Sequence, residues 1–191
     1  MATPPSVEIL RTFKGLILDG DGVWFTGDEF RATLQSGEVV IMKQRCYPDG
    51  QGLSFLRAIG VSVLFATAEK QPLESIVERL NGLPSVQSGA WRPIAARTGL
   101  RTGSGKVPAV EEWLTEQSLT WQDCAYIGDD RNDIECMQKA GLAVTPSDGQ
   151  RVAKKVAHLV LSKPGGSGAI REFAEMVLDA RDVDERTLPF A

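Results

Sequence analysis

The sequence predicts an α/β fold in which helices cover both faces of a parallel sheet. Two observations predict it. Short apolar runs rich in Val, Leu and Ile alternate with stretches of helical periodicity, and no repeat, low-complexity tract or linker divides the 191 residues. This length is usual for one domain with its own hydrophobic core. We therefore expect a single domain over residues 1–191, with its core at 13–180 and short tails on either side.

The predicted strands are short apolar runs, each compact enough to be buried within a parallel sheet. They cover residues 13–19, 61–66, 124–129, 142–145 and 159–161. Apolar residues at helical spacing fill the gaps between these runs. This spacing predicts helices after Pro72, from Lys106 onward, ahead of Gly141 and around Ile170.

Two segments interrupt the alternation of strands and helices. Residues 23–48 contain a Gln35-Ser36-Gly37 turn between apolar stretches, which predicts an antiparallel hairpin that serves as a flap or an assembly surface. Residues 89–105 are rich in Gly and Arg. There we expect a long loop that is poorly ordered and lies near a substrate.

Composition excludes several kinds of site. The formal net charge is -4, from 21 Lys and Arg against 25 Asp and Glu, and the basic residues are scattered, so we expect no nucleic-acid partner. The longest uncharged apolar stretch, residues 58–68, is about half of what a membrane-spanning helix requires, so we expect no membrane contact. Three cysteines without a Cys-x-x-Cys pair indicate a reducing, cytoplasmic location. A single histidine, His158, excludes metal sites of several imidazoles, so catalysis is expected from carboxylates.

Carboxylates concentrate where two predicted strands end. Asp19 and Asp21 follow the first strand, and Asp129 and Asp130 close the strand that begins at Cys124. Such strand ends meet at the edge of an open parallel sheet where ligands bind. Four acidic groups repel one another unless a hard cation binds, and oxygen ligands without imidazole or thiolate favour Mg2+. The alternative is that these residues only form turns and helix caps.

The same residues resemble the motifs of haloacid dehalogenase superfamily phosphatases. The first motif is similar to Asp19-Gly20-Asp21-Gly22-Val23, the second to Thr67, the third to Lys106 and the fourth to Gly128-Asp129-Asp130. The subgroup is the capless one that includes 3-deoxy-octulosonate 8-phosphate phosphatase, the nononic acid (KDN) 9-phosphate phosphatases and the C-terminal domain of animal acylneuraminate cytidylyltransferases. The resemblance implies a three-layer parallel sheet with a hairpin after the first strand and no cap domain.

This resemblance implies roles for particular residues. Asp19 is the expected nucleophile, which forms an aspartyl phosphate, and Asp21 is the expected general acid and base. Thr67 and Lys106 are expected to hold the phosphoryl oxygens. Mg2+ is the implied cofactor. Its expected ligands are Asp19, the main-chain carbonyl of Asp21, Asp129 and, as ligand or as support, Asp130.

The implied substrate is a 2-keto-3-deoxy sugar acid phosphate, which belongs to sialic acid or octulosonate biosynthesis. The second motif reads Thr67-Ala68-Glu69-Lys70 where octulosonate phosphatases carry Thr-Gly-Arg. Because this form is similar to the nononic acid phosphatases, nine carbons are favoured over eight, and Glu69 is a candidate contact. The substrate's carboxylate and phosphate need cations beyond Mg2+, for which Arg45, Lys70 and Lys106 are candidates. Asp49 is either a substrate contact or only a helix cap.

The resemblance further implies a homotetramer in which hairpins assemble and neighbouring subunits complete the site. Two non-catalytic alternatives stand beside the phosphatase. One is an assembly domain related to the cytidylyltransferase tail, and the other is a module that binds metal and phosphate without turnover. The C-terminal domain of the animal cytidylyltransferases resembles an inactive phosphatase that has lost carboxylates from its motifs. Asp19, Asp21, Asp129 and Asp130 are all present here, which favours activity.

Overall fold

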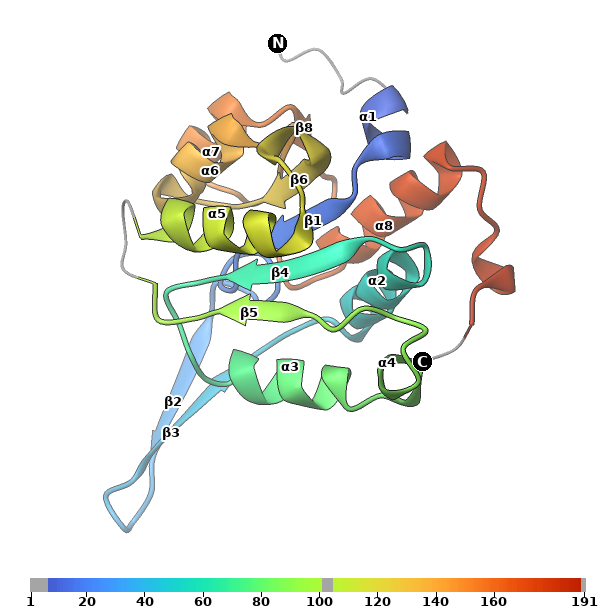
Figure 1. The fold of residues 1–191 in the computed structure, drawn as a ribbon. Coiled ribbons are helices and arrows are strands. Elements are labelled where there is room, and N and C mark those ends of the chain that lie inside the picture. Colours follow the sequence, from blue (N-terminus) through green and yellow to red (C-terminus); the bar gives the residue numbers. More distant parts are fainter. Residues whose placement is uncertain (1–6, 101–104, 190–191) are drawn as a thin grey trace.

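The computed structural model describes residues 7–100 and 105–189, and it shows helices on both faces of one parallel sheet (Figure 1). The strands of this sheet run in the order β5-β4-β1-β6-β7-β8. Their bounds are β1 Gly15–Leu18, β4 Ser62–Ala66, β5 Ala95–Arg97, β6 Cys124–Ile127, β7 Leu142–Thr145 and β8 Leu159–Val160. The predicted α/β fold is confirmed, and every strand except β5 lies in a predicted apolar run.

The helices divide between the two faces of the sheet. They are α1 Val7–Thr12, α2 Tyr47–Ala58, α3 Leu73–Asn81, α4 Pro84–Gln87, α5 Lys106–Gln117, α6 Ile134–Lys139, α7 Arg151–Val156 and α8 Ala169–Ala180. Buried residues of α1, α2, α3 and α8 belong to one hydrophobic cluster, and those of α5, α6 and α7 belong to the other. None of the helices described is long and apolar enough to cross a membrane.

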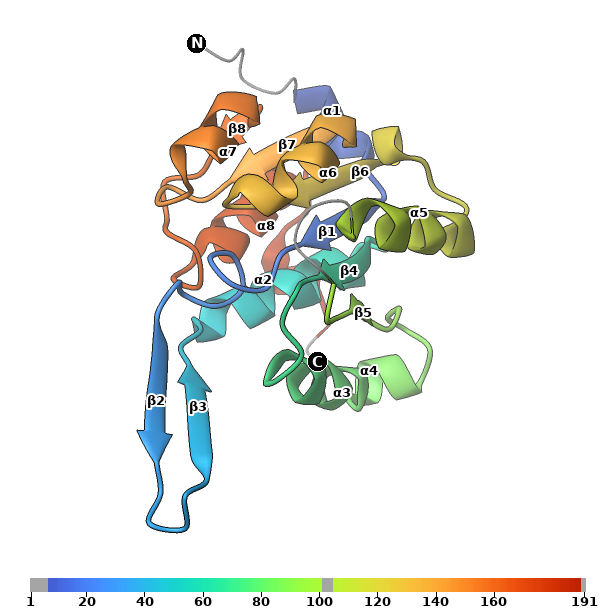
Figure 2. The same cartoon turned by 90° about the vertical axis from the view of Figure 1, so that its left-hand side faces the viewer.

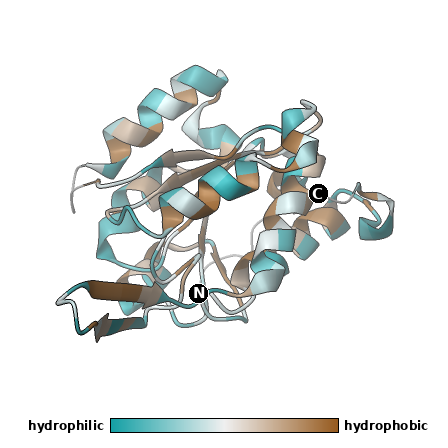
Figure 3. Cartoon of the chain, turned by 90° about the horizontal axis from the view of Figure 1, so that it is seen from below, coloured by the Kyte–Doolittle hydropathy of each residue, from teal (hydrophilic) through white to brown (hydrophobic). Residues whose placement is uncertain are grey.

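Both faces of the central strands are buried, which explains why they are apolar without interruption in the sequence. Side chains alternate between the two faces of a strand. Leu16 and Leu18 of β1 join the cluster that contains Phe173 of α8, whereas Ile17 joins the cluster that contains Trp113 of α5. Figure 3 shows the strands as mainly hydrophobic and the helices as carrying both hydrophobic and hydrophilic residues.

The predicted hairpin is present and stands apart from the main sheet. β2 Glu29–Thr33 and β3 Val39–Lys43 pair in antiparallel register and project from the body of the molecule (Figures 1 and 2). At the base of the hairpin, the Thr26 N–H donates to the Gln44 carbonyl at 3.0 Å. Five large apolar side chains on this hairpin are exposed, namely Phe30, Leu34, Val39, Ile41 and Met42.

The prediction of an unstructured loop over residues 89–105 is wrong for its middle part. Ala95–Arg97 forms the edge strand β5, which pairs in parallel with β4. Three residues with two alanines give no apolar run, so periodicity does not reveal this strand. The Thr67 N–H donates to the Arg97 carbonyl at 3.0 Å, so the segment reaches the second motif. Residues 101–104 lie outside the described part of the chain.

Candidate active site

The site lies at the carboxyl edge of the three central strands. β1 pairs in parallel with β4 on one side and with β6 on the other, with Leu18 opposite Phe65 and Ile127. Residues that directly follow these strands therefore lie side by side. This topology brings together Asp19 after β1, Thr67 after β4 and the loop after β6 that carries the fourth motif.

Asp19 is a buried carboxylate, and only one of its two oxygens contacts donors among the described residues. Its Oδ1 accepts the Gly20 N–H at 2.7 Å and lies 2.9 Å from Lys106 Nζ. Its Oδ2 accepts no hydrogen bond from the described residues. Burial, followed by the negative charge of Asp133, raises the pKa of Asp19 to about 7 against the opposing effect of Lys106.

Lys106 begins α5 and lies beside two carboxylates of this edge. Its Nζ lies 2.7 Å from Asp133 Oδ1 and 2.9 Å from Asp19 Oδ1, and only 2% of its side chain is exposed. Burial lowers the pKa of Lys106, but the charges of Asp133 and Asp19 outweigh burial and raise it. Lys106 is therefore a fixed positive charge between two carboxylates.

Asp133 holds the arrangement together, and the sequence prediction did not include it among the site residues. It is fully buried. Its Oδ1 accepts from Lys106 Nζ and from the Tyr126 hydroxyl, each at 2.7 Å. Its Oδ2 accepts the main-chain N–H groups of Asp129 at 3.1 Å and Asp130 at 3.3 Å. Four donors thus occupy both oxygens, and Asp133 positions the lysine and the fourth-motif loop together.

Asp129 has the opposite character, because its carboxylate accepts no hydrogen bond from the residues that the structure describes. Burial, followed by the charges of Asp133, Asp19 and Asp130, raises the pKa of Asp129 to about 8. Gly22 packs against this carboxylate, since an added Cβ would lie 2.2 Å from Asp129 Oδ2, and its φ of +75° also favours glycine.

Carboxylate oxygens of Asp19, Asp129 and Asp133 lie within 4.8 Å of one another. Three carboxylates beside one lysine leave uncompensated negative charge in a buried site. The carboxylate of Asp129 also accepts no hydrogen bond from the described residues. This combination fits a hard divalent cation, which takes oxygen ligands and would neutralise the surplus. Asp19 and Asp129 are the side chains with free oxygens for it.

Asp21 lies at the rim and is held by the hairpin. Lys43 of β3 places its Nζ 2.8 Å from Oδ1 and 2.6 Å from Oδ2 of Asp21. The Lys43 side chain is 4% exposed and that of Asp21 is 42% exposed. Lys43 Nζ also lies 3.9 Å from Glu69 Oε2. The hairpin therefore contributes a buried cation to the site, which the sequence prediction did not identify.

The second motif packs on the first. Thr67 is 2% exposed, and a Cβ on Gly20 would lie 2.8 Å from its Oγ1, so the two loops touch. Oγ1 of Thr67 accepts the Glu69 N–H at 3.3 Å. The Lys70 side chain packs on Gly99, where an added Cβ would lie 2.8 Å from Lys70 Cε. Glu69 and Lys70 thus stand between the first motif and the segment that contains β5.

Other predicted site residues lie elsewhere or make local contacts. Asp49 is fully buried and accepts the N–H groups of Gly168 at 3.0 Å and Arg171 at 2.9 Å, so it caps α8 and not its own helix α2. Arg45 stacks 5.2 Å over the ring of Trp24 and lines a separate cavity beside α2.

Asp130 makes contacts within its own loop. Its Oδ1 accepts the Arg131 N–H at 2.6 Å. It is the N-cap of the short 3-10 turn Arg131–Asp133 and forms a reciprocal capping box with Asp133. Among the described residues, the group of carboxylates close enough to share a metal ion contains Asp133 and not Asp130. Asp130 therefore supports the loop that carries Asp129.

Comparison with known proteins identifies the family. The sequence profile of haloacid dehalogenase-like hydrolases matches residues 61–172, which is more than half of the chain. The chain belongs to this family. The resemblance inferred from the motifs is thereby confirmed, and the structure, in the residues it describes, shows the family fold without a cap domain.

Relatives of two kinds share sequence with this haloacid dehalogenase-like hydrolase. The 3-deoxy-D-manno-octulosonate 8-phosphate phosphatase of Yersinia pestis is 30% identical over 87% of this chain and 80% of that protein. N-acylneuraminate cytidylyltransferase A of Danio rerio is 38% identical over 68% of this chain. This chain spans 27% to 30% of the length of the cytidylyltransferases that it matches.

Solved structures share the fold over most of the chain. The Yersinia pestis 3-deoxy-D-manno-octulosonate 8-phosphate phosphatase superposes with a TM-score of 0.75 at 28% identity, covering 92% of this hydrolase and 86% of that chain. The Moraxella catarrhalis enzyme of the same name, in complex with magnesium, phosphate and KDO, gives a TM-score of 0.75 at 23% identity, covering 92% and 91%. Because the identity is only 23%, the similarity to the Moraxella catarrhalis enzyme shows a shared fold and nothing more.

Proposed function

We propose that this hydrolase is a Mg2+-dependent phosphomonoesterase that acts on a 2-keto-3-deoxy sugar acid phosphate through an aspartyl phosphate on Asp19. The observation that carries the proposal is the pair of carboxylates at the carboxyl edge of the sheet, buried Asp19 and half-buried Asp129, with Lys106 in contact with Asp19. Two such carboxylates repel each other and an incoming phosphate unless cations offset them. This is the requirement of a metal-dependent phosphoryl transfer site.

The proposed reaction has two displacements. One carboxylate oxygen of Asp19 attacks phosphorus, and the bond from phosphorus to the sugar oxygen breaks as Asp21 protonates that oxygen. Asp21, now a carboxylate, takes a proton from water, and this water displaces Asp19 from the phosphoryl group. Thr67 Oγ1 and Lys106 Nζ hold the phosphoryl oxygens during both steps, and Asp133 keeps Lys106 in place.

The proposed Mg2+ ligands are Asp19, Asp129 and the main-chain carbonyl of Asp21. When bound there, Mg2+ would supply positive charge that offsets the repulsion between Asp19 and an anionic phosphate. Asp133 is not included because four donors already occupy its oxygens. Asp130 is assigned a supporting role, because it caps the loop that carries Asp129.

The favoured substrate is a nine-carbon keto sugar acid 9-phosphate of the KDN type, with 3-deoxy-D-manno-octulosonate 8-phosphate as the second candidate. Relatives named for each sugar class support this choice, since the matches include octulosonate phosphatases and acylneuraminate cytidylyltransferases. The Glu69-Lys70 pair in the second motif favours nine carbons. We propose that Lys70 binds the carboxylate of the substrate and that Glu69 accepts from its hydroxyl groups.

A substrate panel tests the proposal. Phosphate release is measured for the nine-carbon 9-phosphate, the eight-carbon 8-phosphate and simple phosphate esters, with Mg2+ and with a chelator. We expect the highest kcat/KM for the nine-carbon ester and none without Mg2+. Failure on the whole panel, with Mg2+ binding shown by calorimetry, would contradict the proposal. That result would favour a non-catalytic assembly domain related to the cytidylyltransferase tail.

The hairpin supports a second element of the proposal, a homotetramer in which neighbouring subunits complete the site. Phe30 and Met42 lie opposite each other on one face of the hairpin, and Val39 and Ile41 are exposed on its other face. Monomeric proteins rarely leave such apolar surface uncovered. Light scattering coupled to size exclusion tests it. A tetramer that dissociates in a Phe30→Ser, Met42→Ser double variant is expected, with Val152→Ser on α7 as the control. A monomeric wild type with full activity would contradict it.

We also propose a cytoplasmic location. Cys46, Cys124 and Cys136 are all free thiols. Unpaired cysteines are usual in a reducing compartment. Cell fractionation of the tagged chain tests the location, and recovery outside the cytoplasm would contradict it.

A further inference from the structure

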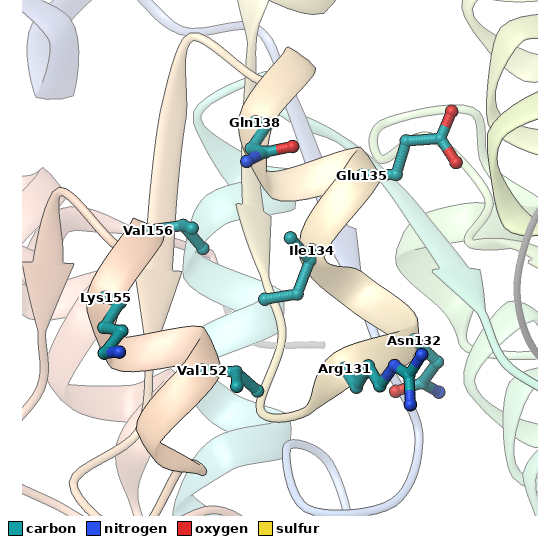
Figure 4. Close-up of a pocket in the computed structure, with 8 residues that line it drawn as sticks. All are labelled: Arg131, Asn132, Ile134, Glu135, Gln138, Val152, Lys155 and Val156. Atoms are coloured by element: carbon teal, nitrogen blue, oxygen red, sulfur yellow. The ribbon is translucent and has the colours of Figure 1, made fainter.

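Two cavities lie outside the acidic site. One of about 510 Å3 lies between α6 and α7, where Glu135 shares the wall with Arg131 and Lys155, so charges of both signs are present (Figure 4). The other, of about 490 Å3, lies beside α2, α3 and the C-terminal segment 185–189. We call it the arginine cavity, because four arginines and a single acidic residue stand among the described residues that line it. None of the carboxylates of the acidic site lines it.

Two of the four arginines of this cavity are neutralised within the chain. Arg171 pairs with Glu175 and with Glu185, each at 2.6 Å. Arg186 pairs with Asp184 at 2.6 Å. These two side chains line the cavity, but their positive charges are balanced by the paired carboxylates.

The other two arginines, Arg45 and Arg79, have no carboxylate partner in the part of the chain that the structure describes. The guanidinium of Arg45 is stacked on Trp24, which fixes its position. Burial, followed by the positive charge of Arg79, lowers the pKa of Arg45. Both guanidinium groups line the same cavity, where their like charges repel each other. An anion bound between them would replace this repulsion with charge-assisted hydrogen bonds.

The rest of the wall suits a ring. Phe55, Leu80 and Trp91 provide an apolar surface. Trp91 is 3% exposed, and its indole N–H is buried without an acceptor among the described residues. The side chain of Tyr47, which is exposed, adds a further aromatic face to the same wall.

We propose that the arginine cavity binds an organic anion of the size of a nucleoside monophosphate, with its phosphate between Arg45 and Arg79 and its ring against Phe55 and Trp91. The positive charge selects the phosphate and the apolar wall selects the ring. Binding requires no Mg2+, because no carboxylate of the acidic site takes part. The proposal is therefore independent of the reaction proposed for Asp19.

Adenosine 5′-monophosphate is the probe for this site. It is compared with ribose 5-phosphate, which lacks the ring, and with adenosine, which lacks the charge. The full chain is titrated by calorimetry at low salt with a chelator present, so that no divalent cation draws phosphate to the acidic site. We expect the monophosphate to bind at least about tenfold more tightly than either analogue. The indole N–H signal of Trp91, assigned with a Trp91→Phe variant, is expected to shift on binding.

Matched variants decide whether the cavity is responsible. Arg45→Gln and Arg79→Gln are each expected to weaken binding of the monophosphate by about tenfold or more. Arg151→Gln removes the same charge from an exposed position on α7 and is expected to leave binding unchanged. Equal weakening in all three variants would overturn the proposal, as would ribose 5-phosphate binding as tightly as the probe. Absence of any binding up to about 5 mM would overturn it too.

Discussion

The acidic edge and the hairpin are neighbours in sequence, yet they follow opposite patterns of burial. Asp19, a charged side chain, is 4% exposed, whereas Phe30, a large apolar one, is 54% exposed. Each arrangement is unfavourable for an isolated chain, since burying charge and exposing apolar surface both cost free energy. We propose that each region meets a different kind of partner. The edge fits a cation, and the hairpin fits another protein surface.

Lys43 joins the two regions. It lies on β3 of the hairpin, and its ammonium group contacts both carboxylate oxygens of Asp21 at the acidic edge. Assembly through the hairpin would therefore act directly on the position of the proposed acid and base. Single substitutions in each region test this difference.

The largest effect is expected from Asp133→Asn. This variant keeps the shape of the side chain but removes the charge that pairs with Lys106 at 2.7 Å. Asp19 still contacts Lys106 in this variant, but removal of one partner of a buried ion pair destabilises a fold by about 3–5 kcal/mol. We expect a lower denaturant midpoint and a loss of phosphatase activity of about a hundredfold or more. Asp130→Asn is the control at the exposed cap, and an equal loss of stability there would contradict the account.

Two isoleucines, one in the main sheet and one in the hairpin, allow the stabilising contributions of these two elements to be compared. Ile17 of β1 is fully buried, whereas Ile41 of β3 is 45% exposed. Ile17→Ala is expected to lower the free energy of unfolding by about 2–5 kcal/mol. Ile41→Ala is expected to change it by less than about 0.5 kcal/mol when measured at dilutions that keep the chain monomeric. Urea unfolding measures both, and similar costs would show that the hairpin is part of the core.

Removal of divalent cations is expected to make stability fall as pH rises. The raised pKa values of about 7 for Asp19 and about 8 for Asp129 lie above the usual value of 3.8. Between pH 4 and 8, the folded chain therefore holds protons that the unfolded chain has released, and ionisation destabilises the fold. Thermal midpoints with a chelator should fall from pH 5 to pH 8, and Mg2+ should restore them at pH 8.

Asp129→Asn is the matched control for this dependence on pH. It removes one of the two titrating groups, so the decline of the thermal midpoint with pH should flatten. It should also reduce the gain from Mg2+. A metal-free wild type that becomes more stable from pH 5 to pH 8 would contradict the account.

A smaller effect is expected from Lys43→Gln, which removes the contact between the hairpin and Asp21. Because Asp21 then loses its fixed position, kcat should fall by about tenfold while KM changes little. Lys43→Arg, which keeps the charge and can still reach the carboxylate, should recover most of the activity. Steady-state kinetics on the preferred substrate measures both variants. Full activity in Lys43→Gln would show that the hairpin does not position Asp21.

Much of the fold could be predicted from the sequence because burial on both faces leaves an uninterrupted apolar run. β1, β4, β6 and β7 all have this property. The edge strand β5 does not, because its three residues are half-buried and include only two alanines and an arginine. Its place depends on pairing with β4, which is a tertiary interaction that periodicity does not show.

Part of the candidate site was also predictable, since Asp19, Thr67, Lys106 and Asp129 follow or begin elements that are visible in the sequence. The structure brings these four to one edge. The remainder depends on contacts across the chain. Lys43 reaches Asp21 through the register of the hairpin, which spacing alone does not fix.

Asp133 illustrates a different limit. It stands three residues after Asp130, a spacing typical of a capping box, and this pattern was the one available signal. The same pattern is common at helix starts without any functional role. Its partnership with Lys106 is visible only in three dimensions, because the two residues are 27 positions apart.

Turnover of p-nitrophenyl phosphate by Asp21→Asn in the presence of Mg2+ tests directly whether Asp19 is the nucleophile. The p-nitrophenolate leaves without a proton, so Asp19 can still be phosphorylated, but the second step lacks its base. We predict a burst of about one p-nitrophenolate per chain followed by slow release, with no burst in Asp19→Asn. Release by Asp19→Asn at the rate of the wild type would contradict the account.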